Sequence, residues 1–152
     1  MKWMTREQVR VGRMGCAWLI QRFIDPGARF LFAPSDVIAA AEREDATAFH
    51  VPGSETARQG ERSSFEVMLD RYHLTGDPAL VLLGKIVGTA DVANSPWHQP
   101  EGPGLKAATE GIRAAQSDDA ARLAAGASLF DAFYAYSQDA IKRGRPNGLF
   151  LD

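Results

Sequence analysis

The first third of the chain alternates between short apolar runs and helical patterns, which leaves few topologies open. Apolar runs of strand length are separated by two amphipathic stretches that are long enough for helices. This order favours a small parallel sheet, because parallel neighbours need crossover connections. The expected strands are KWMT (2–5), RFLFAP (29–34) and TAFHV (47–51), and the expected helices cover 13–24 and 35–44.

The first helical stretch has one apolar face, which predicts that it packs on a core. It ends before Pro26, because the residue before a proline is disfavoured in the helical region. Ser35 is expected to cap the second helix through its hydroxyl. The apolar face of the first stretch is formed by Cys16, Leu19, Ile20 and Phe23.

After residue 51 the strand signals stop and helices follow. Ser63 and Glu66 form the pattern of a capping box, and Asp77 followed by Pro78 is typical of another helix start. The predicted fold class is therefore α+β: a small, mainly parallel three-stranded sheet (βαβαβ) followed by a helical C-terminal half. A proline- and glycine-rich loop is expected over 93–104, and two more helices over 105–115 and 118–142.

The length of 152 residues fits one domain with a sizeable core. We expect that domain to cover residues 1–142 and to be followed by a tail over 143–152. The tail is basic and then apolar. We expect it either to fray or to dock on a partner, in a homodimer or a heteromeric complex.

Composition excludes several classes of protein. The chain is 45% hydrophobic and 24% charged, as in ordinary globular proteins, and no apolar run approaches the ~20 residues of a membrane span. The first residues lack the apolar segment of a signal peptide, so a cytoplasmic protein without membrane contact is expected. One cysteine cannot form an internal disulfide. Cys16 and the three histidines are not spaced like zinc ligands, so neither a metal nor a cofactor is predicted.

The charge is unevenly distributed along the chain. The formal net charge is -2, but residues 1–30 hold six lysines and arginines against two acidic residues. The rest of the chain is therefore acidic. This distribution favours a site for a small anion or an intramolecular contact over nucleic-acid binding.

Arg13 is the strongest candidate for a ligand-binding residue. It is expected at the start of the first helix, where unpaired amides and the helix dipole favour an anion. Gly12 and Gly15 allow a ligand to approach the backbone. Tetrahedral oxyanions such as sulfate, phosphate and chromate suit the forked donors of guanidinium groups.

Arg6 and Arg10 are weaker ligand-binding candidates. They lie between the first strand and the first helix, and ligands of parallel sheets bind at such connections. The alternative for Arg13, Arg6 and Arg10 alike is that they pair with acidic residues of the C-terminal half, such as Asp118 or Asp131.

Trp18 and Arg22 are further candidates for the ligand site, but a structural role is favoured for both. The indole is expected to pack, and the guanidinium to pair with Asp25 or a neighbouring carboxylate. Cys16 lies on the apolar face, which predicts a buried thiol with a raised pKa and low reactivity.

Three further residues could line or serve the site. Ser63 is explained by the capping box, yet a helix start beside Arg58 and Arg62 could also bind an anion. Glu61 is a candidate catalytic base, with an ion pair to Arg58 or Arg62 as the alternative. His50 is a second catalytic candidate, placed on the third expected strand, where a single histidine is more often structural.

Several motifs occur in a distinctive order: KWMTRE, GRMGCAWLIQRFIDPGARFLF, GERSSFEVML, DPALVLLGKIV, GLKAATEGI and LFDAFYAYS. With these motifs the chain resembles the C-terminal domain of the chromate-resistance ChrB family, from Trp3 to Ser137. The resemblance implies a bacterial domain connected with chromate sensing or resistance. In longer members it follows a DNA-binding part, which is not expected in this chain.

The chain departs from the family pattern at positions that could bind a metal. The resemblance implies that a metal site, if the family has one, has been lost here. Glu61 and Asp91 are the acidic residues that remain. Many relatives carry aspartate at Gly12, histidine near Arg58 and Gln59, cysteine at Ser63, and a His–Asp pair at Gly88 and Thr89.

Together, the residues and the resemblance predict a ChrB-like domain that binds a small oxyanion such as chromate or sulfate through arginines. One alternative is a cofactor-free enzyme acting on a sulfated or phosphorylated small molecule. Its arginines would hold the leaving oxyanion while Glu61 or His50 handles a proton. Another is a subunit that binds a partner through the apolar tail. Whether the domain catalyses a reaction stays open.

Overall fold

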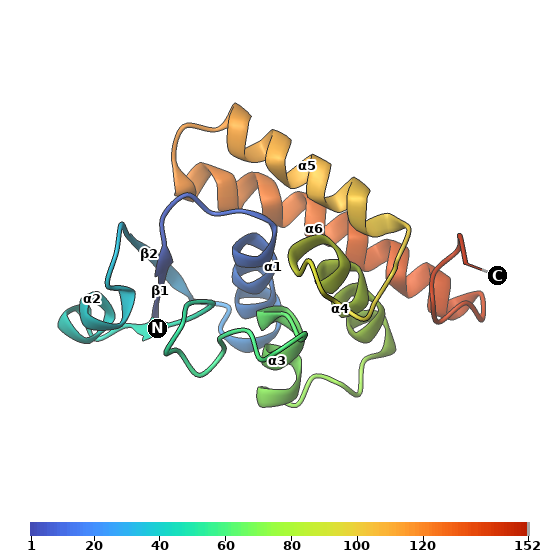
Figure 1. The fold of residues 1–152 in the computed structure, drawn as a ribbon, viewed down its shortest axis with the longest axis horizontal. Coiled ribbons are helices and arrows are strands. Elements are labelled where there is room, and N and C mark those ends of the chain that lie inside the picture. Colours follow the sequence, from blue (N-terminus) through green and yellow to red (C-terminus); the bar gives the residue numbers. More distant parts are fainter. Residues whose placement is uncertain (152) are drawn as a thin grey trace.

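The structure, a computed structural model, describes residues 1–151. A small sheet lies at one end of the molecule and helices form the rest (Figure 1). In chain order the elements are β1 (Lys2–Arg6), α1 (Val11–Leu19), the π-helix η1 (Ile20–Ile24), β2 (Arg29–Ala33), α2 (Val37–Glu44), β3 (Thr47–Ala48), α3 (Ser64–Arg71), α4 (Pro78–Asp91), α5 (Glu101–Ala115) and α6 (Asp119–Lys142).

β1 is the central strand of the sheet, with β2 on one side and β3 on the other. Both neighbours run parallel to it. The β1–β2 register extends from the pair Lys2 and Arg29 to the pair Arg6 and Ala33. The predicted parallel βαβαβ arrangement, followed by helices, is therefore confirmed.

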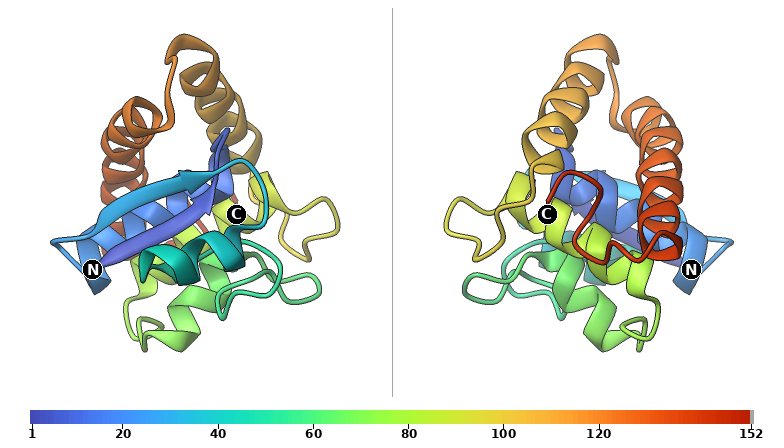
Figure 2. Two further views of the ribbon diagram at one scale, coloured as in Figure 1. Left: turned by 90° about the vertical axis from the view of Figure 1, so that its left-hand side faces the viewer. Right: turned by 90° about the vertical axis from the view of Figure 1, so that its right-hand side faces the viewer.

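The two faces of β1 pack against different layers. Trp3 belongs to the main core, which includes α1, whereas Met4 belongs to a smaller core with Val37 and Ala41 of α2. Figure 2 shows α1 and α2 on opposite sides of the strands. A central parallel strand is covered on both faces, and each face of β1 carries a buried apolar residue, Trp3 on one and Met4 on the other.

The first helical segment extends as predicted to residue 24, but it changes type on the way. The amide of Asp25 donates to the carbonyl of Ile20 at 2.7 Å, an i to i+5 bond that defines the π-helical turn η1. The Asp25 carboxylate then accepts a hydrogen bond from the Trp3 indole at 2.9 Å. This contact fixes the end of the helical segment on the central strand.

Three local predictions were wrong in detail. The third strand ends at Ala48 rather than residue 51, and His50 follows it with a φ of 53°. Ser35 does not cap α2, because Asp36 holds the N-cap position in a left-handed conformation without a side-chain hydrogen bond. Helix α5 begins at Glu101, inside the stretch predicted as a loop.

The other predicted helix starts are confirmed. The Ser63 hydroxyl accepts from the amide of Glu66 at 3.2 Å, and the Glu66 carboxylate accepts from the amide of Ser63 at 2.9 Å. This is the reciprocal capping box at the start of α3. Asp77 caps α4 by accepting from the amides of Ala79 and Leu80.

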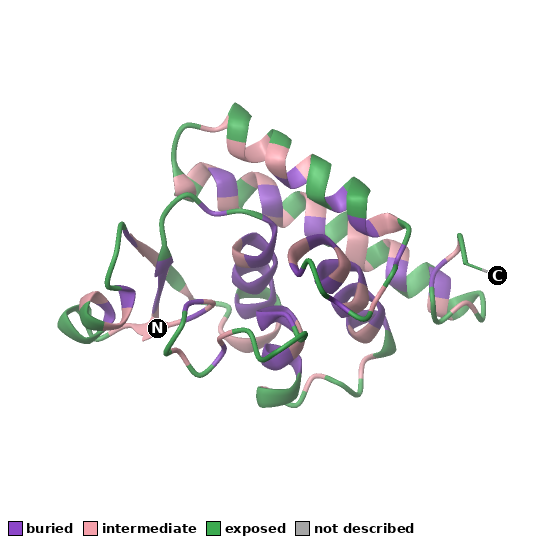
Figure 3. Cartoon of the chain, in the orientation of Figure 1, coloured by how far each residue is buried: buried purple, intermediate pink, exposed green. Residues whose placement is uncertain are grey.

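Helix α1 lies at the centre of the molecule, in contact with α3, α4, α5 and α6. Figure 3 shows it as buried along most of its length. Eight of its nine residues are buried, and the exception is Arg13. The fold therefore places one half-buried guanidinium at the start of its most enclosed helix.

The tail, as far as Leu151, folds back onto the helices of its own chain. The amide of Leu149 donates to the Tyr136 hydroxyl at 2.9 Å, and the Gln99 side chain donates to the carbonyl of Asn147 at 3.0 Å. Phe150 stacks on Tyr136 but is 71% exposed. Within residues 1–151, no helix is both long enough and apolar enough to cross a bilayer.

Candidate functional site

Arg13 is the third residue of α1, and its side chain is only partly exposed. Its Nε atom is buried and has no hydrogen-bond partner among residues 1–151. Burial is the largest influence on this group and lowers the pKa of the guanidinium, while the nearby Asp91 carboxylate raises it. Arg13 is thus a partly desolvated cation that retains unused hydrogen-bonding capacity.

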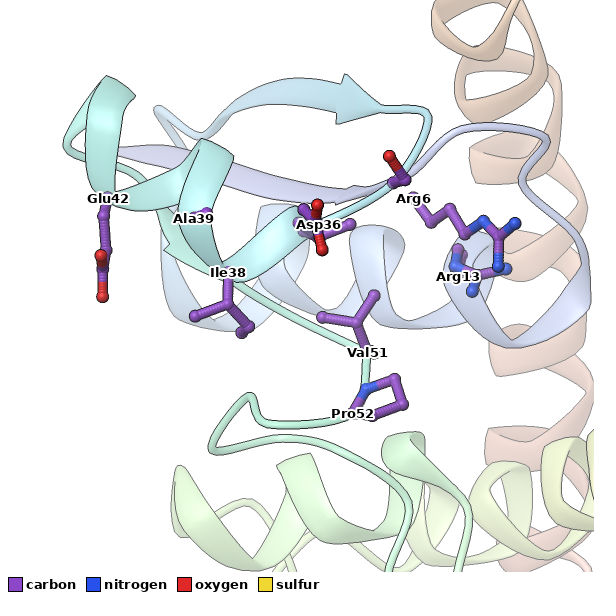
Figure 4. A pocket seen from close by; sticks show the side chains of 10 residues that line it. Arg6, Arg13, Asp36, Ile38, Ala39, Glu42, Val51 and Pro52 are labelled. Atoms are coloured by element: carbon purple, nitrogen blue, oxygen red, sulfur yellow. The ribbon is translucent and has the colours of Figure 1, made fainter.

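Arg13 and Arg6 line the same cavity, which has a volume of about 510 Å³ and is bounded on its far side by α2. We call it the α2 cavity. In Figure 4 both guanidinium groups lie at one end of it, Glu42 lies at the opposite end and Asp36 lies between. The charge of Arg6 lowers the pKa of Arg13 further. The two like charges at one end make that end positive.

A smaller cavity of about 250 Å³ is also lined by Arg13. We call it the α3 cavity, because Ser64, the first residue of α3, contributes to its wall. Among the described residues that line it, none is acidic. The lining residues are Arg13, His50, Val51, Pro52, Ala57, Arg58 and Ser64.

His50 and Asp91 meet at the start of α1. The Nε2 atom of His50 lies 3.3 Å from Oδ2 of Asp91. A Cβ atom on Gly12 would lie only 2.3 Å from each of these two atoms. The absence of a side chain at residue 12 therefore makes room for the pair, and the pair places an imidazole on the wall of the α3 cavity.

The other arginine candidates have partners elsewhere. Arg10 is largely exposed and lies 3.6 Å from the Glu110 carboxylate, outside both cavities that Arg13 lines. Arg22 donates to Asp131 at 2.9 Å. That hydrogen bond raises the pKa of Arg22.

Trp18 is buried, and its indole donates to the same Asp131 carboxylate at 2.7 Å. The structure therefore confirms the expected packing of Trp18, and it pairs Arg22 with Asp131 of α6 rather than with Asp25. Both polar groups hold α1 and η1 against α6. Cys16 is fully buried, as predicted, and burial raises the pKa of its thiol well above its usual range.

Ser63 and Glu61 lie outside both cavities that Arg13 lines. Besides its cap contacts, the Ser63 hydroxyl lies 2.9 Å from the Glu66 carboxylate, which also accepts from the Trp97 indole at 2.6 Å. Glu61 is exposed. Two acidic residues act on Arg13, since the charges of Asp91 and Asp119 both raise its pKa.

The comparisons with known proteins bear on this arrangement. The model of the family described as "ChrB, C-terminal domain" matches residues 3–137. The chain belongs to this family. Protein ChrB of Cupriavidus metallidurans is 36% identical over 142 residues, which is 93% of this chain and 42% of that protein. The chain thus spans less than half of that relative. No solved structure matches it.

In this ChrB C-terminal domain, two of the positions expected to carry metal-binding residues in relatives lie against acidic side chains. Gly12 lies against His50 and Asp91, and a Cβ on Gly88 would lie 2.9 Å from the Glu66 carboxylate. Glycines at both positions leave no side chain to bind a metal. Within the part of the chain that the structure describes, no three histidine, cysteine or acidic residues gather as a metal site.

Asp91 and Arg58 were both visible in the sequence, but their positions next to Arg13 were not predicted. Asp91 is 41 residues from His50 along the chain, so no local pattern could pair them. Arg58 had one signal, since it precedes the capping box at Ser63, where a helix start favours anions.

Proposed function

We propose that this ChrB C-terminal domain contributes to chromate resistance by binding a small oxyanion such as chromate or sulfate. Arg13 is the anchor and Arg6 the second cation, and the domain itself does not contact DNA. The observation that carries the proposal is the buried Arg13 Nε atom, which lacks a partner within residues 1–151, on a cavity shared with Arg6.

An oxyanion fits this environment for three physical reasons. Two adjacent guanidinium groups repel each other, and a dianion between them removes that repulsion. The amides and the dipole at the start of α1 favour negative charge. Partial burial strengthens the attraction, because Coulomb interactions are weaker in bulk water than in a protein.

Calorimetric titration tests the proposal, with sulfate used beside chromate because sulfate cannot oxidise the single thiol. We expect Arg13→Gln to weaken the binding of both anions by about tenfold or more, which corresponds to ~1.4 kcal/mol. Arg6→Gln is expected to weaken it less. Arg10→Gln is the matched control, because Arg10 is exposed and lies near Glu110. Equal affinities of the Arg13 and Arg10 variants would contradict the proposal.

A second candidate function is a cofactor-free enzyme acting on a phosphorylated or sulfated small molecule. The observation in its favour is His50, which lies on the α3 cavity beside Arg13 and within 3.3 Å of Asp91. A carboxylate that orients an imidazole is a common arrangement of a general base. Release of phosphate or sulfate from a panel of esters, lost in His50→Gln, would favour this function over binding alone.

A further inference from the structure

The α3 cavity has the features of a second anion site. Arg13 and Arg58 both line it, and none of its described lining residues is acidic. By contrast, the α2 cavity carries Asp36 and Glu42 in addition to its two arginines. The smaller cavity is thus lined by formal positive charge alone.

Ser64 supplies an observation that is independent of these charges. It is the first residue of α3 and only 1% exposed, yet its hydroxyl has no hydrogen-bond partner in residues 1–151. A buried hydroxyl without a partner costs about 1–3 kcal/mol. A ligand oxygen in the α3 cavity, whose wall Ser64 helps to form, would supply the missing partner.

Arg58 is held in place by neutral acceptors. Its guanidinium donates to the carbonyl of Gly60 and to the side-chain oxygen of Asn94, both at 2.9 Å. Neither contact neutralises the positive charge. The loop therefore positions Arg58 while leaving its charge available to an anion.

The two cavities are adjacent, because Arg13, Val51 and Pro52 line both of them. Val51 and Pro52 form an apolar wall between the two positive regions. A volume of about 510 Å³ is in the range of sites that enclose whole small organic molecules. A tetrahedral oxyanion has too few atoms to fill the α2 cavity. The adjoining α3 cavity adds room for a second anionic group.

We propose that, besides a single oxyanion, the domain binds an organic molecule with two anionic groups, such as a bisphosphorylated compound, held at both cavities at once. This inference rests on the proposed function, because Arg13 is the anchor of the ligand in the proposed function and in this inference alike. One group lies at Arg6 and Arg13, and the other at Arg58 and Ser64. The carbon skeleton crosses Val51 and Pro52.

The test compares methylphosphonate with α,ω-alkane bisphosphonates from methylene to hexamethylene, titrated calorimetrically in metal-free buffer. Two linked groups that reach both subsites gain affinity from their high effective concentration. We expect one chain length to bind at least about tenfold more tightly than methylphosphonate. Arg58→Gln and Ser64→Ala are expected to reduce that ratio.

Matched variants separate failure of the two-site inference from failure of the proposed function and from loss of folding. Ser64→Ala removes a hydroxyl that has no partner, so folding is expected to survive. Arg62→Gln is the control, because Arg62 pairs with Asp70 and lines neither cavity. The two-site inference is overturned, and the proposed function is not, in either of two cases. In the first, no bisphosphonate binds more tightly than methylphosphonate. In the second, Arg58→Gln leaves the ratio of bisphosphonate to methylphosphonate affinity unchanged. If methylphosphonate binding does not depend on Arg13, the proposed function fails as well.

Discussion

The imidazole of His50 and the carboxylate of Asp91 are 3.3 Å apart at the backbone of Gly12. The contact joins the segment after β3 to the last residue of α4, at the start of α1. It also places a negative charge close enough to raise the pKa of Arg13. Three elements that are distant in sequence thus determine the environment of one arginine.

Gly12→Ala is predicted to destabilise the protein. Its new Cβ would lie 2.3 Å from both His50 and Asp91, so one of them must move. We expect a loss of about 1–3 kcal/mol in the free energy of unfolding, measured with urea. Gly111→Ala is the control, since nothing lies within 4 Å of that exposed helical position. A Gly12 variant as stable as the Gly111 variant would contradict the packing described.

Asp131→Ala is predicted to cost more stability than Arg22→Gln. The exposed ion pair with Arg22 contributes at most about 1 kcal/mol. Loss of the carboxylate also deprives the buried Trp18 indole of its acceptor, for a further ~1–3 kcal/mol. Asp139→Ala, which breaks an exposed pair with Arg143, is the control. Urea unfolding at neutral pH checks the order, and similar losses for Asp131 and Asp139 would refute it.

The ion pair of Asp131 is also predicted to make the free energy of unfolding sensitive to acid. The hydrogen bond from Arg22 is the main influence that lowers the pKa of this carboxyl below its ordinary value of 3.8. The folded state therefore holds the proton less tightly than the unfolded state. The stabilisation by the ionised Asp131 carboxylate is therefore present above pH 3.8 and is lost as the pH falls through the folded-state pKa. Acid titrations followed by circular dichroism should therefore show that Asp131→Asn loses less stability on acidification than the unmodified protein.

Local chemistry made part of this structure predictable. The capping box at Ser63 and the Asp77–Pro78 helix start involve neighbours in sequence, and both are observed. The parallel sheet followed from the alternation of strand and helix signals. By contrast, His50 has a left-handed backbone and contacts Asp91, which is 41 residues away in the chain. A strand pattern alone therefore placed His50 wrongly.

The same limit applies to the arginines. Their positive charge was visible in the sequence, but the partner of each was not. Arg22 meets Asp131 across 109 residues of chain, and Arg10 lies close to Glu110. Arg13 differs from these two, because no ion pair within residues 1–151 includes it, although Asp91 and Asp119 act on its charge.

Cys16 is predicted to be unreactive in the folded protein. The thiol is fully buried, and this burial raises its pKa well above the usual range. Dithionitrobenzoate should label it slowly under native conditions and stoichiometrically in urea. Rapid labelling of the folded protein would show that α1 is less enclosed than the structure indicates.

The protein is predicted to lose stability in alkali as Tyr134 ionises. Burial, with a hydrogen bond to Asp77 at 2.6 Å, raises its pKa to about 12 from an ordinary value of 10.0. Because the folded state holds this proton more tightly, the contribution is complete below pH 10 and is lost as the pH rises toward 12. Tyr134→Phe should be less stable at neutral pH and should lose less stability in alkali. Parallel losses in both proteins would contradict this assignment.

The central claim is that Arg13 and Arg6 hold an oxyanion at one end of the α2 cavity. Anomalous diffraction from crystals soaked in chromate measures this directly, because chromium marks the anion. We predict an anomalous peak within hydrogen-bonding reach of both guanidinium groups. A peak only at exposed arginines such as Arg10, or none with Arg13 turned into solvent, would contradict the account.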